Sequence, residues 1–191
     1  MIFNVDEIIR ELPSDAELFS EASWASTSPN HRQKMRLFLK NHLHGKISAE
    51  EAAALDDLNL VPSFRHVFSS SSHSAVAGVV VISSRPIGID LEETQRIKIP
   101  VVQRIASQEE FRSAPSAAHL WCAKEAVFKS LLSEKQPAVL SDFSVNEWQI
   151  GSTMTSFELQ DWQRWSSAPG RGFVFSNSSW TFALFQIQRG K

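Results

Sequence analysis

The stretch Ile87-Gly88-Ile89-Asp90-Leu91-Glu92 alternates between large apolar residues and residues that are small or acidic. Successive side chains of a β-strand point to opposite faces, so the alternation predicts a strand with one apolar face. Asp90 and Glu92 then share the other face with Gly88, beside which another group can approach the backbone. Two carboxylates on one face favour a hard divalent cation, which prefers oxygen ligands. An edge strand with two solvent-facing acids has the same pattern, so the stretch alone leaves both interpretations open.

The residues before this stretch predict a second strand. Four serines, residues 69–72, are followed by His73. Residues 75–82 are then rich in valine, which is favoured in strands, and residues 83–86 have the composition of a turn. We therefore expect the strand over 75–82 and the acidic strand after it to pair as a β-hairpin.

Helical patterns occur on both sides of this predicted hairpin. They cover residues 5–12, 29–39, 48–58, 101–105, 107–111 and 116–132. Ser48 and Ser107 stand where serine caps the start of a helix. Alternating apolar residues near 143–150, 173–175 and 180–185 predict antiparallel strands. The pattern predicts an α+β fold with antiparallel sheets packed against helices. We expect two similar α/β halves, pseudo-twofold related, formed by residues 1–86 and 87–191.

A second group of charged residues lies within residues 120–129, inside one of the predicted helices. Glu125 and Lys129 are four residues apart and therefore neighbours on one helical face. Such a pair is often only a surface salt bridge of small energy. Alternatively, Glu125 can join Asp90 and Glu92 around a magnesium ion, while Lys129 contacts a phosphate.

The composition of the 191-residue chain is that of a globular protein, with 42% hydrophobic and 21% charged residues. A formal charge of −2 argues against a nucleic-acid partner held by a dominant basic surface. The single cysteine, Cys122, excludes an internal disulfide and a cysteine-rich zinc site. The longest apolar run is far shorter than the roughly 20 residues that span a bilayer, and the first residues lack a signal-peptide pattern. We therefore expect a cytoplasmic protein with no membrane partner.

Two motifs together resemble those of the 4′-phosphopantetheinyl transferase superfamily, and they occur in the same order. The family carries a Gly-Ile-Asp-x-Glu strand, as in residues 88–92, and a Trp-x-x-Lys-Glu-Ala/Ser-x-x-Lys helix, as in residues 121–129. Residues 72–74, Ser-His-Ser, are similar to a segment that the larger, Sfp-like class has before its first hairpin strand. The Gly-Lys-Pro element usual before that segment is missing here, and Arg65 offers the nearest basic group.

The resemblance implies transfer of the 4′-phosphopantetheine arm of coenzyme A to a serine of an apo-acyl or peptidyl carrier protein. The reaction is magnesium-dependent and releases 3′,5′-adenosine bisphosphate. The implied metal ligands are Asp90, Glu92 and Glu125. The implied catalytic residues are Glu125, Lys129 and His73, with Glu125 as base and Lys129 beside the leaving phosphate. The implied coenzyme A contacts are His31, Lys34, Arg65, Ser72, His73 and Lys129. We expect a monomer, because the Sfp-like class fuses both halves in one chain.

Other interpretations of these residues remain open. His73 can be a structural histidine. The chain can be a homologue that binds coenzyme A or a carrier without catalysis, or a metal-dependent phosphohydrolase that uses the same acids. A landing surface for an acidic carrier helix is expected from Val101, Val102 and Ile105 with Arg96, Lys98 and Arg104. An amphipathic helix that packs inward explains the same pattern.

Overall fold

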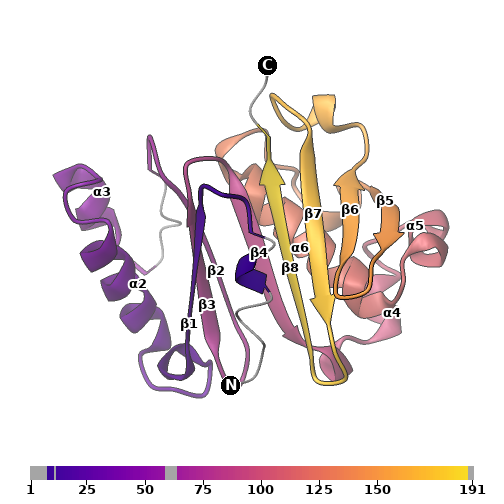
Figure 1. The fold of residues 1–191 in the computed structure, drawn as a ribbon, viewed down its shortest axis with the longest axis horizontal. Helices are drawn as coiled ribbons and strands as arrows, with labels where there is room; N and C mark the ends of the chain where they lie inside the picture. The colour runs from indigo at the N-terminus through magenta and orange to yellow at the C-terminus, as the bar shows by residue number, and fades with distance from the viewer. Residues whose placement is uncertain (1–7, 11, 59–63, 189–191) are drawn as a thin grey trace.

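Two antiparallel β-sheets lie side by side in the computed structural model, which describes residues 8–10, 12–58 and 64–188 (Figure 1). The first sheet has the order β1-β3-β2 and contains β1 (Ala16–Glu21), β2 (Phe68–His73) and β3 (Gly78–Ser83). The second sheet has the order β4-β8-β7-β6-β5. Its strands are β4 (Ile87–Glu93), β5 (Val145–Ile150), β6 (Thr155–Leu159), β7 (Gly170–Ser176) and β8 (Trp180–Ile187). The predicted α+β fold class is confirmed.

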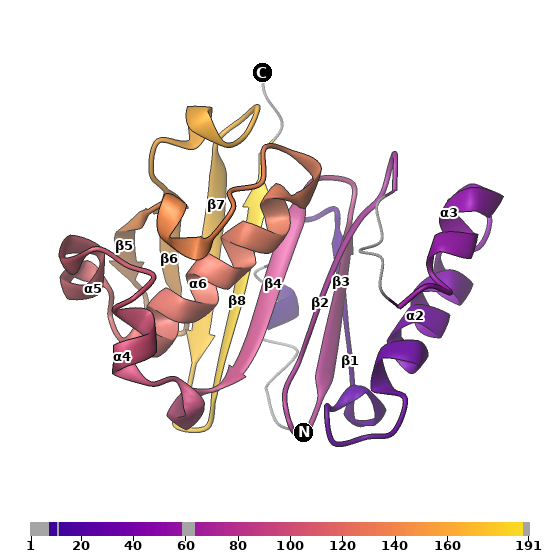
Figure 2. The same cartoon turned by 180° about the vertical axis from the view of Figure 1, so that it is seen from behind.

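Helices cover one face of each sheet. They are α2 (His31–His42), α3 (Ala49–Ala54), α4 (Ile99–Val102), α5 (Gln108–Ser113) and α6 (Ala117–Ser130). The long helix α6 crosses the second sheet, while α2 and α3 flank the first (Figure 2). Ser48 and Ser107 form the capping boxes expected at the starts of α3 and α5. Of the helix expected over residues 5–12, residues 8–10 are helical, and residues 5–7 and 11 lie outside the described residues. None of the described helices is long and apolar enough to cross a membrane.

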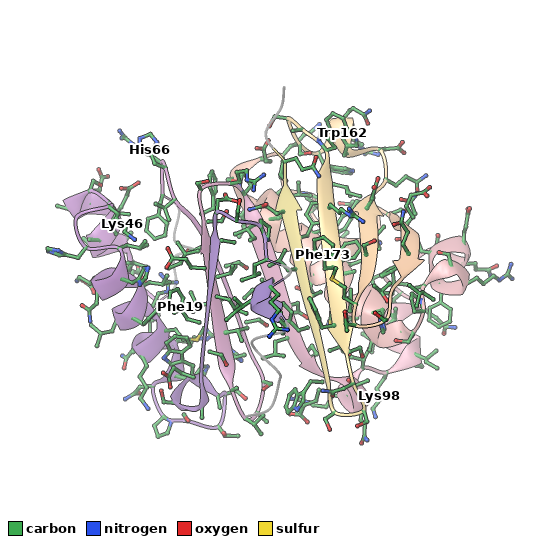
Figure 3. All side chains as sticks on the ribbon, viewed as in Figure 1. Phe19, Lys46, His66, Lys98, Trp162 and Phe173 are labelled. Carbon is green, nitrogen blue, oxygen red and sulfur yellow. The ribbon has the colours of Figure 1, made fainter. Side chains whose placement is uncertain are left out.

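Apolar side chains fill the space between each sheet and its helices. Phe19 of β1, labelled in Figure 3, has its ring centroid 4.8 Å from that of Phe38 of α2. On the second sheet, Phe157 and Phe185 pack beneath α6 and are fully buried. This packing fixes α6 against the strand that carries the acidic residues.

The predicted hairpin between residues 75–82 and the acidic strand is wrong. β3 pairs with β1 and β2, and β4 pairs with β8, so that Asp90 lies opposite Ala183. β3 is buried along its whole length and takes the centre of its sheet, where it needs a neighbour on each side. The serine tract supplies one of these neighbours as β2. Serine is a weak strand former, which is why the sequence did not predict this strand.

A network of hydrogen bonds and one ion pair around Asp15 joins the two sheets at the connection between β3 and β4. The Asp15 carboxylate pairs with the Arg85 guanidinium and accepts hydrogen bonds from Ser83 Oγ, at 3.0 Å, and from Gln186 Nε2, at 3.3 Å. Arg85 holds the pKa of Asp15 well below its usual range. Because Gln186 belongs to β8, one carboxylate links the connection between the sheets to the last strand.

Candidate active site

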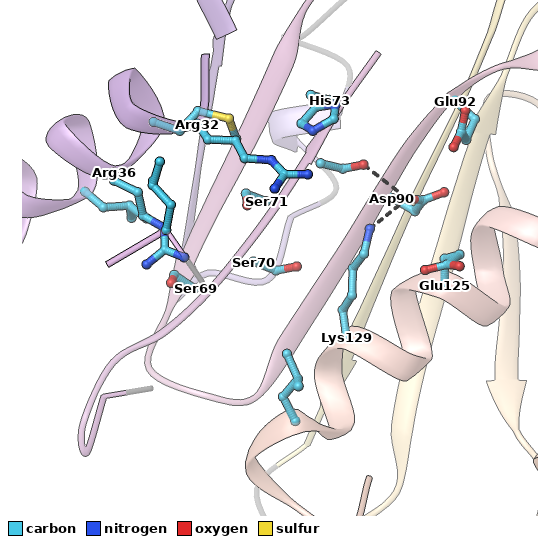
Figure 4. Close-up of a pocket in the computed structure, with 15 residues that line it drawn as sticks. Arg32, Arg36, Ser69, Ser70, Ser71, His73, Asp90, Glu92, Glu125 and Lys129 are labelled. Carbon is cyan, nitrogen blue, oxygen red and sulfur yellow. Dashed lines mark hydrogen bonds and ion pairs between the residues drawn. The ribbon is translucent and has the colours of Figure 1, made fainter. Parts of the chain in front are cut away.

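A pocket of about 500 Å³ lies between the two sheets and their helices. Side chains from α2, β2, β4 and α6 line it. Arg32 and Arg36 lie on one side, whereas Asp90, Glu92 and Glu125 lie on the other (Figure 4). The pocket therefore has a basic side and an acidic side, which suits a ligand that carries phosphates and a bound cation.

The two faces of β4 are those that the alternation predicts. Ile89 and Leu91 are fully buried in a core that also contains Phe182. Asp90 and Glu92 face the pocket from the other side, and Asp90 is only 3% exposed. The strand thus fixes both carboxylates on a rigid element.

Lys129 and Ser72 hold Asp90 in place. Lys129 Nζ donates to Asp90 Oδ1 at 2.8 Å and to the Ile89 carbonyl oxygen at 3.1 Å. Ser72 Oγ donates to the same Oδ1 at 3.1 Å. Burial acts to lower the pKa of Lys129, but the charge and hydrogen bond of Asp90 outweigh it and raise that pKa. The second oxygen, Asp90 Oδ2, is buried and has no hydrogen-bond partner.

The other two carboxylates ionise less readily than an exposed glutamate, because burial raises the pKa of both Glu92 and Glu125. Burial, followed by the nearby charge of Asp90, raises the pKa of Glu92 to about 7. Burial also raises the pKa of Glu125, where Lys129 opposes the effect and Asp90 adds to it. Each of these pKa values reflects a carboxylate that lies near Asp90 with limited access to water.

The donor set fits a hard divalent cation. Across the part of the chain that the structure describes, no three His, Cys, Asp or Glu side chains are already gathered as closely as metal ligands. Asp90, Glu92 and Glu125 nevertheless border one pocket, and Asp90 Oδ2 is a buried acceptor without a donor. Such an oxygen gains from a cation, and carboxylates are preferred ligands of Mg²⁺.

The basic side of the pocket comes from one stripe of α2. Arg32, Met35, Arg36 and Leu39 follow a spacing of three and four residues, so they share a face, and all four line the pocket. Lys34 is exposed and is not among the lining residues. The family resemblance implied Lys34 as a basic contact, although the stripe formed with Met35 and Leu39 could have indicated the two arginines.

His73 lines the pocket, as expected, whereas His31 is not among the lining residues but contacts the His73 ring. Their ring centroids are 4.6 Å apart in an edge-to-face arrangement. Burial, followed by the charge of His31, lowers the pKa of His73. Arg65 is exposed, and its backbone N–H donates to Glu51 Oε1 at 2.8 Å. The structure therefore brings His73 to the pocket but leaves Arg65 outside the residues that line it.

Gly88 allows α6 to approach β4 at the distance the site needs. A Cβ at this position would lie 2.0 Å from the Ala126 carbonyl oxygen and 2.5 Å from the Ser130 backbone nitrogen.

We expect Gly88→Ala to push α6 outward, to cost about 1–3 kcal/mol of unfolding free energy, and to displace Glu125 and Lys129. Urea unfolding measures this cost. Gly45→Ala is the control for the loss of a glycine, because its added Cβ would meet no atom within 4 Å, although its positive φ of 78° adds local strain. An unchanged unfolding midpoint for Gly88→Ala would contradict the close packing.

A comparison with protein-family models identifies the class of this protein. The model described as the 4′-phosphopantetheinyl transferase superfamily matches residues 86–183, half of the chain. The matched region begins next to β4 and ends within β8, so it contains all three pocket carboxylates and Lys129. The chain belongs to the 4′-phosphopantetheinyl transferase superfamily, and the family predicted from the two motifs is confirmed. A search of curated proteins found no match.

Proposed function

We propose that this protein is a magnesium-dependent, Sfp-like transferase that moves 4′-phosphopantetheine from coenzyme A to a serine of an apo-carrier protein. The observation that supports this most is the pocket itself. It places Asp90, Glu92, Glu125 and Lys129 opposite a basic stripe on α2. A diphosphate needs both a cation and fixed positive charges, because its own charge repels an incoming nucleophile.

The metal would be held by Asp90, Glu92 and Glu125. Bound there, Mg²⁺ would supply positive charge to the diphosphate oxygens. Lys129 would hold the leaving phosphate through its ammonium group, and His73 would contact a phosphate from the opposite side. Arg32 and Arg36 would bind the remaining phosphate of the nucleotide end.

The chemical step is a substitution at phosphorus. A bond forms between the carrier serine Oγ and the β-phosphorus, while the bond from that phosphorus to the bridging oxygen breaks. The electron pair of the broken bond leaves with 3′,5′-adenosine bisphosphate. Glu125 is proposed to accept the serine proton, directly or through water.

The carrier is proposed to approach over α4. A small hollow of about 190 Å³ is lined by Arg96, Lys98, Val101 and Trp121, and it also borders Glu92. Val102 is fully buried in the core, so its predicted place on this surface is wrong. It packs inward because a short amphipathic helix must bury one side. The basic and apolar residues that remain suit an acidic, amphipathic carrier helix.

The division into halves at residues 86 and 87 belongs to the same proposal. The first sheet ends at Ser83 and the second begins at Ile87, with the pocket between them. Both sides of the pocket come from one chain, which supports a monomeric enzyme.

Mass spectrometry of the carrier tests the proposed function. The protein is incubated with coenzyme A, magnesium and a panel of apo-acyl and apo-peptidyl carriers, and the matched control is each carrier with its acceptor serine changed to alanine. We expect the mass to rise by one phosphopantetheine in the serine carriers only, and the reaction to stop when EDTA removes the metal. Coenzyme A binding without modification of any carrier would favour a non-catalytic homologue. Nucleotide release without an acceptor would favour a phosphohydrolase.

A further inference from the structure

Strands β2 and β4 lie next to each other, yet their contact is unusual. β2 pairs through its backbone with β3, and β4 pairs with β8. Within the described ranges the two strands share no backbone ladder, and they belong to different sheets. Serine side chains join them instead. Ser70 Oγ accepts a hydrogen bond from the Ile89 backbone N–H at 3.0 Å, and Ser72 Oγ accepts one from Leu91 at 3.1 Å.

The spacing of these hydrogen bonds shows that they form a matched pair. Both join residues that are 19 positions apart, so β2 and β4 run in the same direction and in register. Both hydroxyls are buried, at 8% and 9% exposure for the two serines. A buried backbone N–H without a partner is costly, and the alternation of a strand presents every second N–H to the same neighbour. Ser70 and Ser72, two residues apart on β2, therefore provide hydrogen-bond acceptors for two backbone N–H groups at the edge of β4.

Ser72 has a second hydrogen bond that reaches the acidic side of the pocket. Its hydroxyl accepts from Leu91 and donates to Asp90 Oδ1 at 3.1 Å. Lys129 donates to the same oxygen, so Oδ1 is engaged twice (Figure 4). Asp90 Oδ2 is buried and has no hydrogen-bond partner among these groups. A hydroxyl that is itself held by the backbone of β4 therefore contributes to holding the Asp90 carboxylate in its orientation.

We propose that Ser70 and Ser72 are positioning residues, which fasten β2 to the edge of β4 and orient Asp90 within the pocket. Arg32 and Arg36 reach the pocket from the side of the first sheet, and Asp90 reaches it from β4. The two serines therefore set the distance between the basic and acidic sides. The fastening of the strands is independent of the proposed function, whereas the orientation of Asp90 for a metal rests on it.

Amide hydrogen exchange measured by NMR tests the fastening without any assay of activity. In Ser70→Ala we expect the Ile89 amide to exchange about tenfold faster, and in Ser72→Ala the Leu91 amide, because each loses one buried hydrogen bond. Ser70→Thr and Ser72→Thr keep a hydroxyl and should restore slow exchange; both positions border the pocket. Ser20→Ala, at the other edge of the same sheet, is the control and should leave both amides slow. Unchanged exchange at Ile89 and Leu91 in the alanine variants would overturn the proposal.

A magnesium titration tests the orientation of Asp90. The thermal stability of each variant is followed as magnesium is added. For Ser72→Ala we expect about tenfold more magnesium to be needed for half of the full shift, and Ser72→Thr should recover most of this loss. An unaltered magnesium midpoint in Ser72→Ala would overturn its role in orienting Asp90. If the parent protein modifies no carrier but the amides respond as expected, the fastening stands and the proposed function fails.

Discussion

Asp90→Asn is expected to reduce carrier modification by about a thousandfold while leaving the fold intact. The substitution keeps the size of the side chain but removes the charge that faces Lys129 and the proposed cation. Preorganised charges in an enclosed site contribute effects of this size to catalysis. The measurement is the initial rate at which the mass of the carrier rises, taken at saturating and at limiting magnesium. Circular dichroism and thermal unfolding of the same samples check the fold.

Glu93→Gln is the matched control for this variant. Glu93 follows directly along β4 and, by the alternation of the strand, points away from the face of Asp90 and Glu92. It belongs neither to the proposed ligands nor to the residues that line the pocket. Its transfer rate should stay within a few-fold of the parent rate. If Asp90→Asn also retains near-normal turnover at limiting magnesium, the metal assignment is wrong.

Lys124→Met is expected to lower the free energy of unfolding by about 3–5 kcal/mol. Lys124 is fully buried in α6, and its Nζ donates to Glu110 Oε1 at 2.8 Å and to the Phe143 carbonyl oxygen at 2.5 Å. Glu110 Oε1 also accepts the Val145 backbone N–H at 3.1 Å. Without the lysine, a buried carboxylate loses its counter-charge, which costs far more than a lost surface pair. Urea unfolding at neutral pH measures the change.

Two further variants show whether the expected cost comes from the burial of the charges or from the loss of any ion pair. Lys40→Met removes an exposed pair with Asp56 of similar length, 2.7 Å, and should cost less than about 1 kcal/mol. Changing Glu110 together with Lys124 to methionine should recover part of the stability, because no charge is then left buried. A cost for Lys124→Met no greater than that for Lys40→Met would refute the structural role of the pair.

The features that the sequence predicted correctly are those set by local patterns. The alternation in β4 and the serine caps of α3 and α5 depend on neighbouring residues, and the structure confirms them. The course of α6 follows from its helical spacing in the same way. Local rules of this kind need no knowledge of the rest of the chain.

The features that the sequence did not predict depend on distant contacts. β1 and β6 were not predicted, and the serine-rich β2 is a strand because of its neighbours rather than its composition. The partner of β4 is β8, about ninety residues later, and no turn signal indicates such a pairing. Arg32 and Arg36 share a face of α2 with Met35 and Leu39, which the sequence shows, but the pocket that this face lines exists only once the two sheets meet.

The pairing of β4 with β8 also determines when the site can form during synthesis. β8 ends at Ile187, so synthesis must proceed about ninety residues beyond β4 before the strand that carries Asp90 gains its backbone partner. Contacts between segments so far apart form slowly, since a long intervening loop must close first. A nascent chain that stops before Trp180 would expose an unpaired strand with one apolar face, and it would be a target for chaperones rather than a partly active enzyme.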